Sequence, residues 1–333
     1  MKKVVFFNNK GGVGKTTFTF HLGYALEKIG KRILFVDADP QCNLTSWVCP
    51  EDIIETAWQK DEGKTTNSIF DSIAPIVSGS GDYTVIEPYK VPDKNIWIYV
   101  GDLMLSDFET ELSSAWTQVL AAQERGFRVT SAIYRLINDF AKKNNIDYVL
   151  IDIGPNLGVL NRAMLLSCDN YVIPMVPDMF SLRGTQNIGR VFAGWIKDYQ
   201  LSLTRAGEFK FDVAPGRPQF SGYILQQFNK YRSRIVKAFE KWQSQIPDTI
   251  SQYIIAPLSV PALAPYNLIQ PSSNYQLAEF KNYNALVPMA QNALKPIFDL
   301  TAADGVVGGH MQYVRNCGDE FSNICKAFVT QIS

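Results

Sequence analysis

The stretch that decides the fold is VVFFNNKGGVGKTT, which runs from Val4 to Thr17. Its first four residues are β-branched or aromatic, a pattern typical of a short buried strand. After the glycine-rich segment, an apolar-periodic run over residues 16–29 predicts a helix that ends at Gly30. A second apolar run, residues 33–36, predicts the next strand. Strand, loop, helix and strand in this order predict a βαβ unit with parallel strands and a right-handed crossover.

Strand patterns and helix patterns alternate along most of the chain. Further strands are predicted at residues 96–100, 148–151, 171–176, 222–226 and 253–256. Helices are predicted at residues 67–73, 105–112, 129–143, 157–167, 182–196, 231–242 and 283–298. This alternation predicts an α/β fold, with a doubly wound, mostly parallel sheet flanked by helices.

The chain is expected to form a single domain with excursions. Residues 1–300 make up that domain, in which residues 51–92 are an elaborated connection and residues 200–219 a polar, hairpin-like excursion. Residues 301–333 are expected to be a flexible joint at Gly305–Gly309 followed by a C-terminal helix near residues 311–329.

Composition and charge exclude several classes of protein. Of the 333 residues, 32 are Lys or Arg and 32 are Asp or Glu, so a constitutively cationic nucleic-acid protein is excluded. The N-terminal apolar run has only the four residues 4–7, too short for a signal peptide, and no run approaches the ~18 residues of a membrane span. The five cysteines form no C-x-x-C pair, which speaks against a disulfide framework or a zinc site. We therefore expect a soluble, cytoplasmic protein.

The glycine-rich segment has the chemistry of a phosphate-binding loop. It follows the pattern G-x-x-x-x-G-K-[ST], except that Asn9 stands at the first glycine position. Glycines let backbone N–H groups converge on phosphate oxygens, and the helix that follows adds its positive N-terminal end. Lys15 is expected to bridge the β- and γ-phosphates of a nucleotide, and the Thr16 hydroxyl to bind Mg²⁺. The nucleotide-binding residues expected here are Gly11, Gly12, Val13, Gly14, Lys15, Thr16 and Thr17.

A second lysine makes the resemblance to a known family specific. The run KGGVGKTT, which begins at Lys10, resembles the deviant Walker A motif of the ParA/MinD superfamily of P-loop ATPases, and especially that of ParA-type partition ATPases. The resemblance is close over residues 1–45 and looser over residues 96–230. It implies that Lys10 reaches across a dimer interface to the partner's nucleotide, and so couples ATP binding to homodimerisation.

Two further acidic segments extend the predicted site. The segment DADPQ begins at Asp37 and resembles the family's Asp-x-Asp-Pro-Gln motif, which implies that Asp39 is catalytic and Asp37 is a supporting, metal-associated residue. The strand YVLID ends at Asp152 and resembles a Walker B motif with Asp152 near Mg²⁺. The family usually continues with Asp-x-Pro-Pro, whereas here Gly154 precedes the proline.

Two kinds of contact have weaker signals. Asn229 follows the strand at 222–226 and is a candidate to hydrogen-bond adenine, although a turn or capping role is an alternative. A basic helix and two arginines are a candidate DNA-binding face, with a solvated helix face as the alternative. Its residues are Arg183, Arg190, Lys230, Arg232, Arg234, Lys237 and Lys241.

The leading functional prediction is a bacterial ParA-like ATPase. The resemblance implies that a Mg²⁺–ATP dimer binds DNA non-specifically, on the nucleoid, and is reset when a ParB-like or cargo adaptor protein stimulates hydrolysis. In this way the protein would segregate DNA or position cargo.

Three alternatives from the same superfamily remain open. A MinD-like membrane protein needs a basic amphipathic C-terminal helix, but Lys326 is the only cation from Phe321 onward, so we do not expect stable membrane binding. The stripe Phe321, Ile324, Phe328 and Ile332 instead favours a docked tail or a dimer contact. An iron-protein-like reductase has no supporting cysteine pattern. The combination of Lys10 with the DADPQ segment argues against a metabolic ATP-dependent ligase.

Overall fold

The computed structural model describes residues 1–59, 67–227, 239–269, 274–283 and 285–332. These residues contain an eight-stranded sheet with the strand order β3-β4-β2-β5-β1-β6-β7-β8. The strands are β1 (Lys2–Phe6), β2 (Ile33–Asp37), β3 (Tyr89–Lys90), β4 (Ile96–Tyr99), β5 (Tyr148–Asp152), β6 (Asn170–Met175), β7 (Gln219–Gln227) and β8 (Gln276–Lys281). All neighbouring strands are parallel except β3 and β4. The predicted doubly wound, mostly parallel α/β fold is confirmed.

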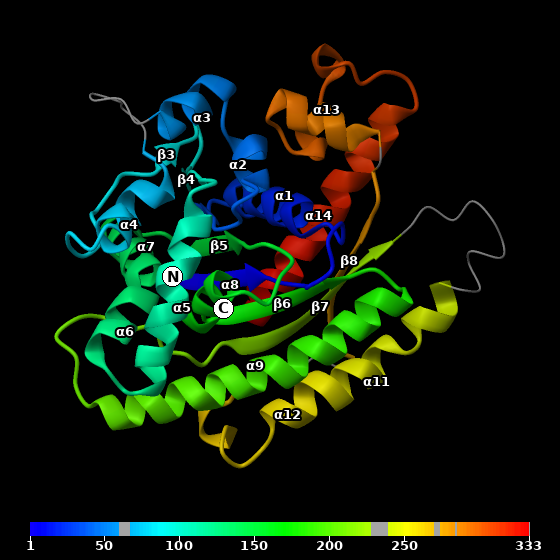
Figure 1. The fold of residues 1–333 in the computed structure, drawn as a ribbon. Helices are drawn as coiled ribbons and strands as arrows, with labels where there is room; N and C mark the ends of the chain where they lie inside the picture. Colours follow the sequence, from blue (N-terminus) through cyan, green and yellow to red (C-terminus); the bar gives the residue numbers. More distant parts are fainter. Residues whose placement is uncertain (60–66, 228–238, 270–273, 284, 333) are drawn as a thin grey trace.

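Helices cover both faces of the sheet (Figure 1). One face carries α1 (Lys15–Lys28), α2 (Asn43–Val48), α13 (Leu286–Ala293) and α14 (His310–Ile332). The other carries α4 (Ile69–Val77), α5 (Leu105–Leu120), α6 (Glu124–Thr130), α7 (Ala132–Lys143), α8 (Val159–Ser167), α9 (Met179–Ala206) and α11 (Ile246–Ile250). The remaining elements are α3 (Glu51–Trp58), the π-helix η1 (Ser251–Ile255), α12 (Ala256–Leu258) and the 3₁₀ turns η2 (Ala264–Tyr266), η3 (Ile297–Asp299) and η4 (Ala302–Asp304).

The central strand β1 explains why two layers of helices are needed. Val4 and Phe6 point into one hydrophobic core, and Val5 and Phe7 into the other. Because successive side chains of a strand lie on opposite faces, a strand with consecutive apolar residues must be covered on both. Its carboxyl end, like those of β2 and β5, meets one edge of the sheet, where Phe6 and Asp37 each pair in register with Asp152.

The C-terminal helix α14 packs against α1 and β8 (Figure 1). The predicted stripe Phe321, Ile324, Phe328 and Ile332 is buried in the same core as α1. The Phe321 ring lies 5.8 Å from that of Phe18, measured between centroids. The apolar face of α14 is therefore occupied within this chain. No helix in the described residues is long and apolar enough to cross a membrane.

The strand predicted at 253–256 is wrong, because this segment is helical and spans the end of η1 and the start of α12. Its short apolar run fits one face of a helix as well as a strand, and it packs against α9. The contact is so close that a Cβ atom on Gly189 would lie 1.5 Å from the Tyr253 carbonyl oxygen. Helix–helix packing therefore decided the conformation.

The hairpin-like excursion predicted at 200–219 is also wrong. Helix α9 continues through Ala206, because Tyr199 and Ser202 extend its buried face, and it ends at Gly207 with φ 79°. The closing helix is shorter than predicted, since α13 ends before Leu294, which has φ 51°. Strand β8 was not predicted. Most of the basic helix predicted at 231–242 lies outside the described residues. The described part near its end, residues 239–243, is helical.

Candidate active site

The glycine-rich segment forms the loop between β1 and α1. Gly12 and Gly14 have φ angles of 72° and 78°, a left-handed conformation that favours glycine. A Cβ atom on Gly11 or Gly12 would meet nothing within 4 Å, so protein packing does not demand glycine there. Gly14 is the N-cap of α1 and no side chain caps it. The loop therefore presents open space at a helix N-terminus, where backbone N–H groups favour an anion.

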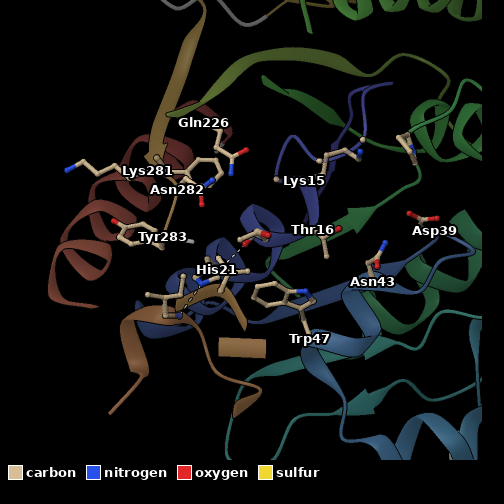
Figure 2. A pocket seen from close by; sticks show the side chains of 18 of the residues that line it. Lys15, Thr16, His21, Asp39, Asn43, Trp47, Gln226, Lys281, Asn282 and Tyr283 are labelled. Carbon is tan, nitrogen blue, oxygen red and sulfur yellow. Dashed lines mark hydrogen bonds between the residues drawn. The ribbon is translucent and has the colours of Figure 1, made fainter. Parts of the chain in front are cut away.

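A cavity of about 350 Å³ lies beside this loop. Figure 2 shows Asp39 toward one end, Gln226 and the segment Lys281–Tyr283 toward the other, and Lys15 and Thr16 between them. The other lining residues are Gly11, Gly12, Gly14, Thr17, His21, Gln41, Asn43, Trp47, Pro155, Phe280, Val287, Ile297 and Phe321. The cavity thus combines a cationic, glycine-lined region with an aromatic region.

Lys15 holds its ammonium group inside the protein. The side chain is buried, and its Nζ donates a long hydrogen bond of 3.5 Å to the carbonyl oxygen of Lys10. Burial lowers the pKa of Lys15, although Asp152 and Asp39 partly oppose the shift. A buried ammonium with one long hydrogen bond to a neutral oxygen is suited to bind an anion that enters the cavity.

Thr16 and Asp152 form a pair of oxygen donors. The Thr16 Oγ1 donates a 2.6 Å hydrogen bond to Asp152 Oδ2, whereas Asp152 Oδ1 is buried without a partner in the described structure. Burial raises the pKa of Asp152 to about 7, and the Thr16 hydrogen bond and Lys15 oppose the shift. A hydroxyl beside a carboxylate with an unpartnered oxygen fits Mg²⁺, which prefers oxygen ligands.

These two residues leave room for other ligands of the metal. Within the described ranges, no group of three or more His, Cys, Asp or Glu side chains could hold a metal ion. Mg²⁺ in nucleotide sites commonly keeps one or two protein ligands and completes its shell with phosphate and water oxygens. The small donor set is therefore compatible with Mg²⁺ that is bound together with a nucleotide.

Asp37 is turned toward the backbone rather than the cavity. Its Oδ2 accepts a 2.7 Å hydrogen bond from the Thr45 amide, and its Oδ1 accepts one of 3.3 Å from the Asp39 amide. It is fully buried, and burial together with the charge of Asp152 raises its pKa to about 8. These contacts organise the segment that carries Asp39, so the predicted metal role of Asp37 stays a prediction.

Asp39 lines the cavity and faces the loop after β5. Its Oδ1 accepts a 3.0 Å hydrogen bond from the Gln41 amide. A Cβ atom on Gly154 would lie 3.2 Å from Asp39 Oδ1. The glycine in the Asp-x-Gly-Pro segment therefore lets this loop approach the carboxylate closely, and Pro155 next to it also lines the cavity.

Lys10 forms an ion pair with Asp178 and is not among the residues that line the cavity. Asp178 is the N-cap of α9, and its Oδ1 accepts a 2.8 Å hydrogen bond from the Ser181 amide. Burial opposes ionisation of Asp178, but the hydrogen bonds from Lys10 and Ser181 outweigh it and lower the pKa. The Lys10 side chain is therefore held by Asp178 of its own chain.

The structure leaves several predicted contacts outside the described residues, namely Asn229, Lys230, Arg232, Arg234 and Lys237. Arg183, Arg190 and Lys241 are exposed. Val13 is fully buried, so only its backbone is available to a ligand.

Sequence reasoning missed the far end of the cavity. Gln226 lies three residues before Asn229, and a Cβ on Gly14 would lie 3.0 Å from its amide. Lys281 ends β8, a strand with no strong sequence pattern, and Asn282 and Tyr283 follow it directly. For Gln226 and for the segment 281–283 alike, the available sequence signal was a position at the carboxyl end of a parallel strand.

Comparison with known proteins identifies relatives of this chain. Residues 1–204 match the family described as AAA domain. The sporulation initiation inhibitor protein Soj of Bacillus subtilis is 30% identical over 188 residues, which cover 56% of this chain and 63% of Soj. The aligned part is thus less than two thirds of Soj. The chromosome-partitioning ATPase Soj of Treponema pallidum is 27% identical, with 69% of this chain and 78% of the relative covered.

Solved structures share the fold. Protein DIP2308 from Corynebacterium diphtheriae has a TM-score of 0.69 at 24% identity, covering 88% of this chain and 97% of that one. An aspartate-to-alanine variant of McdA from Cyanothece, in complex with ATP, has a TM-score of 0.60 at 18% identity. The match covers 99% of this chain and 96% of McdA. pNOB8 ParA bound to nonspecific DNA has a TM-score of 0.53 at 19% identity. The match covers 99% of this chain and 98% of pNOB8 ParA.

Proposed function

The chain belongs to the family described as AAA domain and is similar to chromosome-partitioning proteins such as Soj, and on this premise we propose that it is a ParA-like ATPase of the ParA/MinD superfamily. The observation that carries the proposal is the convergence of Lys15, Thr16 and Asp39 on one cavity, with Asp152 bonded to Thr16. Lys15 and Thr16 begin α1, which follows β1, whereas Asp39 lies just after β2 and Asp152 ends β5. The carboxyl ends of these three strands meet at one edge of the sheet.

The proposed reaction is hydrolysis of ATP to ADP and phosphate. The loop amides and Lys15 bind the phosphates, and Lys15 balances charge that develops on them. Asp39 orients the attacking water, and its ordering by the Gln41 amide supports this role. Thr16 and Asp152 would hold Mg²⁺, which would supply neutralisation of phosphate charge.

We also propose that ATP drives homodimerisation through Lys10. In the described structure the Lys10 ammonium is paired with Asp178, so this ion pair would open for Lys10 to bind a partner's nucleotide instead. Binding of ATP and of a second protomer would then be coupled through this one side chain.

The third element of the proposal is non-specific DNA binding in the bacterial cytoplasm. The exposed cations Arg183, Arg190 and Lys241 support it, as does the DNA-bound ParA among the structural neighbours. A ParB-like or cargo adaptor protein stimulates hydrolysis and releases the DNA. The MinD-like alternative loses its support, because the apolar face of α14 is buried within this chain.

Two experiments test these proposals. Equilibrium binding of Mg²⁺–ATP should be lost in Lys15→Ala, and normal binding by that variant would refute the phosphate site. DNA retention on a filter should require ATP and weaken as salt rises. Retention that is independent of ATP, or absent at low salt, would refute the DNA-binding proposal.

A further inference from the structure

The order of residues along the cavity gives the nucleotide a direction. Asp39 lies toward one end, Lys15 and Thr16 in the middle, and Gln226 with the segment 281–283 toward the other end (Figure 2). Because the terminal phosphate reacts beside Asp39, the remainder of the nucleotide must extend away from it. The base end therefore points toward Gln226 and the loop that follows β8.

The chemistry of that end suits a planar base. Phe280 and Tyr283 line it with aromatic rings, and Gln226 and Asn282 bring side-chain amides to the same region. Aromatic rings stack on bases, while amides offer a donor and an acceptor to a base edge. The geometry of the loop after β8 thus bears directly on how well the base is held.

Helix α14 holds this loop through one carboxylate. Glu320 Oε1 accepts a 3.2 Å hydrogen bond from the Lys281 amide, and Glu320 Oε2 accepts one from the Tyr283 hydroxyl. The next residue, Phe321, lines the cavity and packs against Phe280, with 6.2 Å between ring centroids. Glu320 is itself only partly exposed, and burial raises its pKa. The two hydrogen bonds span both ends of the three-residue segment.

We propose that Glu320 is a positioning residue for the nucleotide base, acting through the Lys281 amide and the Tyr283 hydroxyl. The C-terminal helix then contributes to base affinity without touching the phosphates. The inference rests on the proposed nucleotide site, because it concerns the base end of the same cavity.

The test compares two ligands that share phosphates but differ in the base. Dissociation constants for Mg²⁺–ATP and for inorganic tripolyphosphate with Mg²⁺ are measured by calorimetry on the full chain. Glu320→Ala should weaken ATP binding by about ten-fold and leave tripolyphosphate binding within about two-fold. Glu320→Gln should restore ATP binding, since its amide can accept from Lys281 and donate to Tyr283.

A matched control comes from the neighbouring residue. Asp319→Ala removes an exposed carboxylate from the same helix, and both ligands should bind as in the wild type. If Glu320→Ala does not fold, Tyr283→Phe removes one of the two hydrogen bonds and should weaken ATP selectively, by about three-fold.

Four outcomes would overturn the inference. Equal weakening of both ligands would mean that Glu320 supports the fold in general, and unchanged ATP binding would mean that the loop needs no support. If the wild type binds tripolyphosphate but ATP no more tightly, the base has no site here. If the wild type binds neither ligand, the proposed function fails and the inference falls with it.

Discussion

The ion pair between Lys10 and Asp178 gives the sharpest prediction about the dimer. Asp178→Asn removes the charge that holds Lys10, while asparagine remains a good N-cap for the Ser181 amide. If Lys10 must leave Asp178 before it reaches a partner, the variant should dimerise more readily with ATP. The pair acts as an intramolecular competitor for the signature lysine.

The size of the effect follows from the exposure of the pair. The side chains of Lys10 and Asp178 are 29% and 33% exposed, so the pair stabilises the free protomer by roughly 0.5–1 kcal/mol. Two such pairs open for each dimer formed, which amounts to about 1–2 kcal/mol. The dimer dissociation constant should therefore fall by about 5- to 30-fold.

Sedimentation velocity over a protein concentration series, with a non-hydrolysable ATP analogue, measures this constant. Asp212→Asn is the matched control, because it removes the exposed partner of Lys142 at 3.1 Å. That control should leave the dimer constant unchanged. An equal or weaker dimer in Asp178→Asn would refute the competition and indicate that Asp178 supports Lys10 in the dimer as well.

The remaining predictions concern pH and packing. Burial raises the pKa of Asp152 to about 7, so below that pH its carboxylate is protonated and a proton must leave before it can bind Mg²⁺. The affinity for ATP in the presence of Mg²⁺ should therefore fall from pH 8 to pH 6, by up to about ten-fold per pH unit below 7. Calorimetry with and without Mg²⁺ measures this, and an equal pH dependence without Mg²⁺ contradicts it. Gly189→Ala should lower the melting temperature, since its Cβ would lie 1.5 Å from the Tyr253 carbonyl; unchanged melting speaks against that packing. Phe328→Ala should lower the free energy of unfolding by about 3–5 kcal/mol, because Phe328 is fully buried. A loss of less than about 1 kcal/mol in denaturant titrations would mean that α14 is not part of the core.

The phosphate end of the site could be predicted from sequence because its constraints are local. Gly12 and Gly14 adopt positive φ angles within one loop, a conformation that favours glycine. Lys15 and Thr16 follow directly, in the first turn of α1. Asp152 ends a five-residue buried strand, a pattern that needs no knowledge of distant residues.

The base end could not be predicted in the same way. Lys281 and Tyr283 lie at the cavity where β8 pairs with β7, and Glu320, from the last helix, accepts hydrogen bonds from both residues. Neither relation leaves a mark in the local sequence. The misassigned strand at 253–256 has the same cause, since packing against α9 outweighed local propensity.

The central claim is that this cavity hydrolyses ATP with Asp39 as the residue that orients water. Phosphate release and dimer state are measured together for the wild type and Asp39→Ala in the presence of Mg²⁺–ATP. The variant should bind ATP and remain dimeric while phosphate release falls at least about 100-fold. Wild-type phosphate release by Asp39→Ala would contradict the claim.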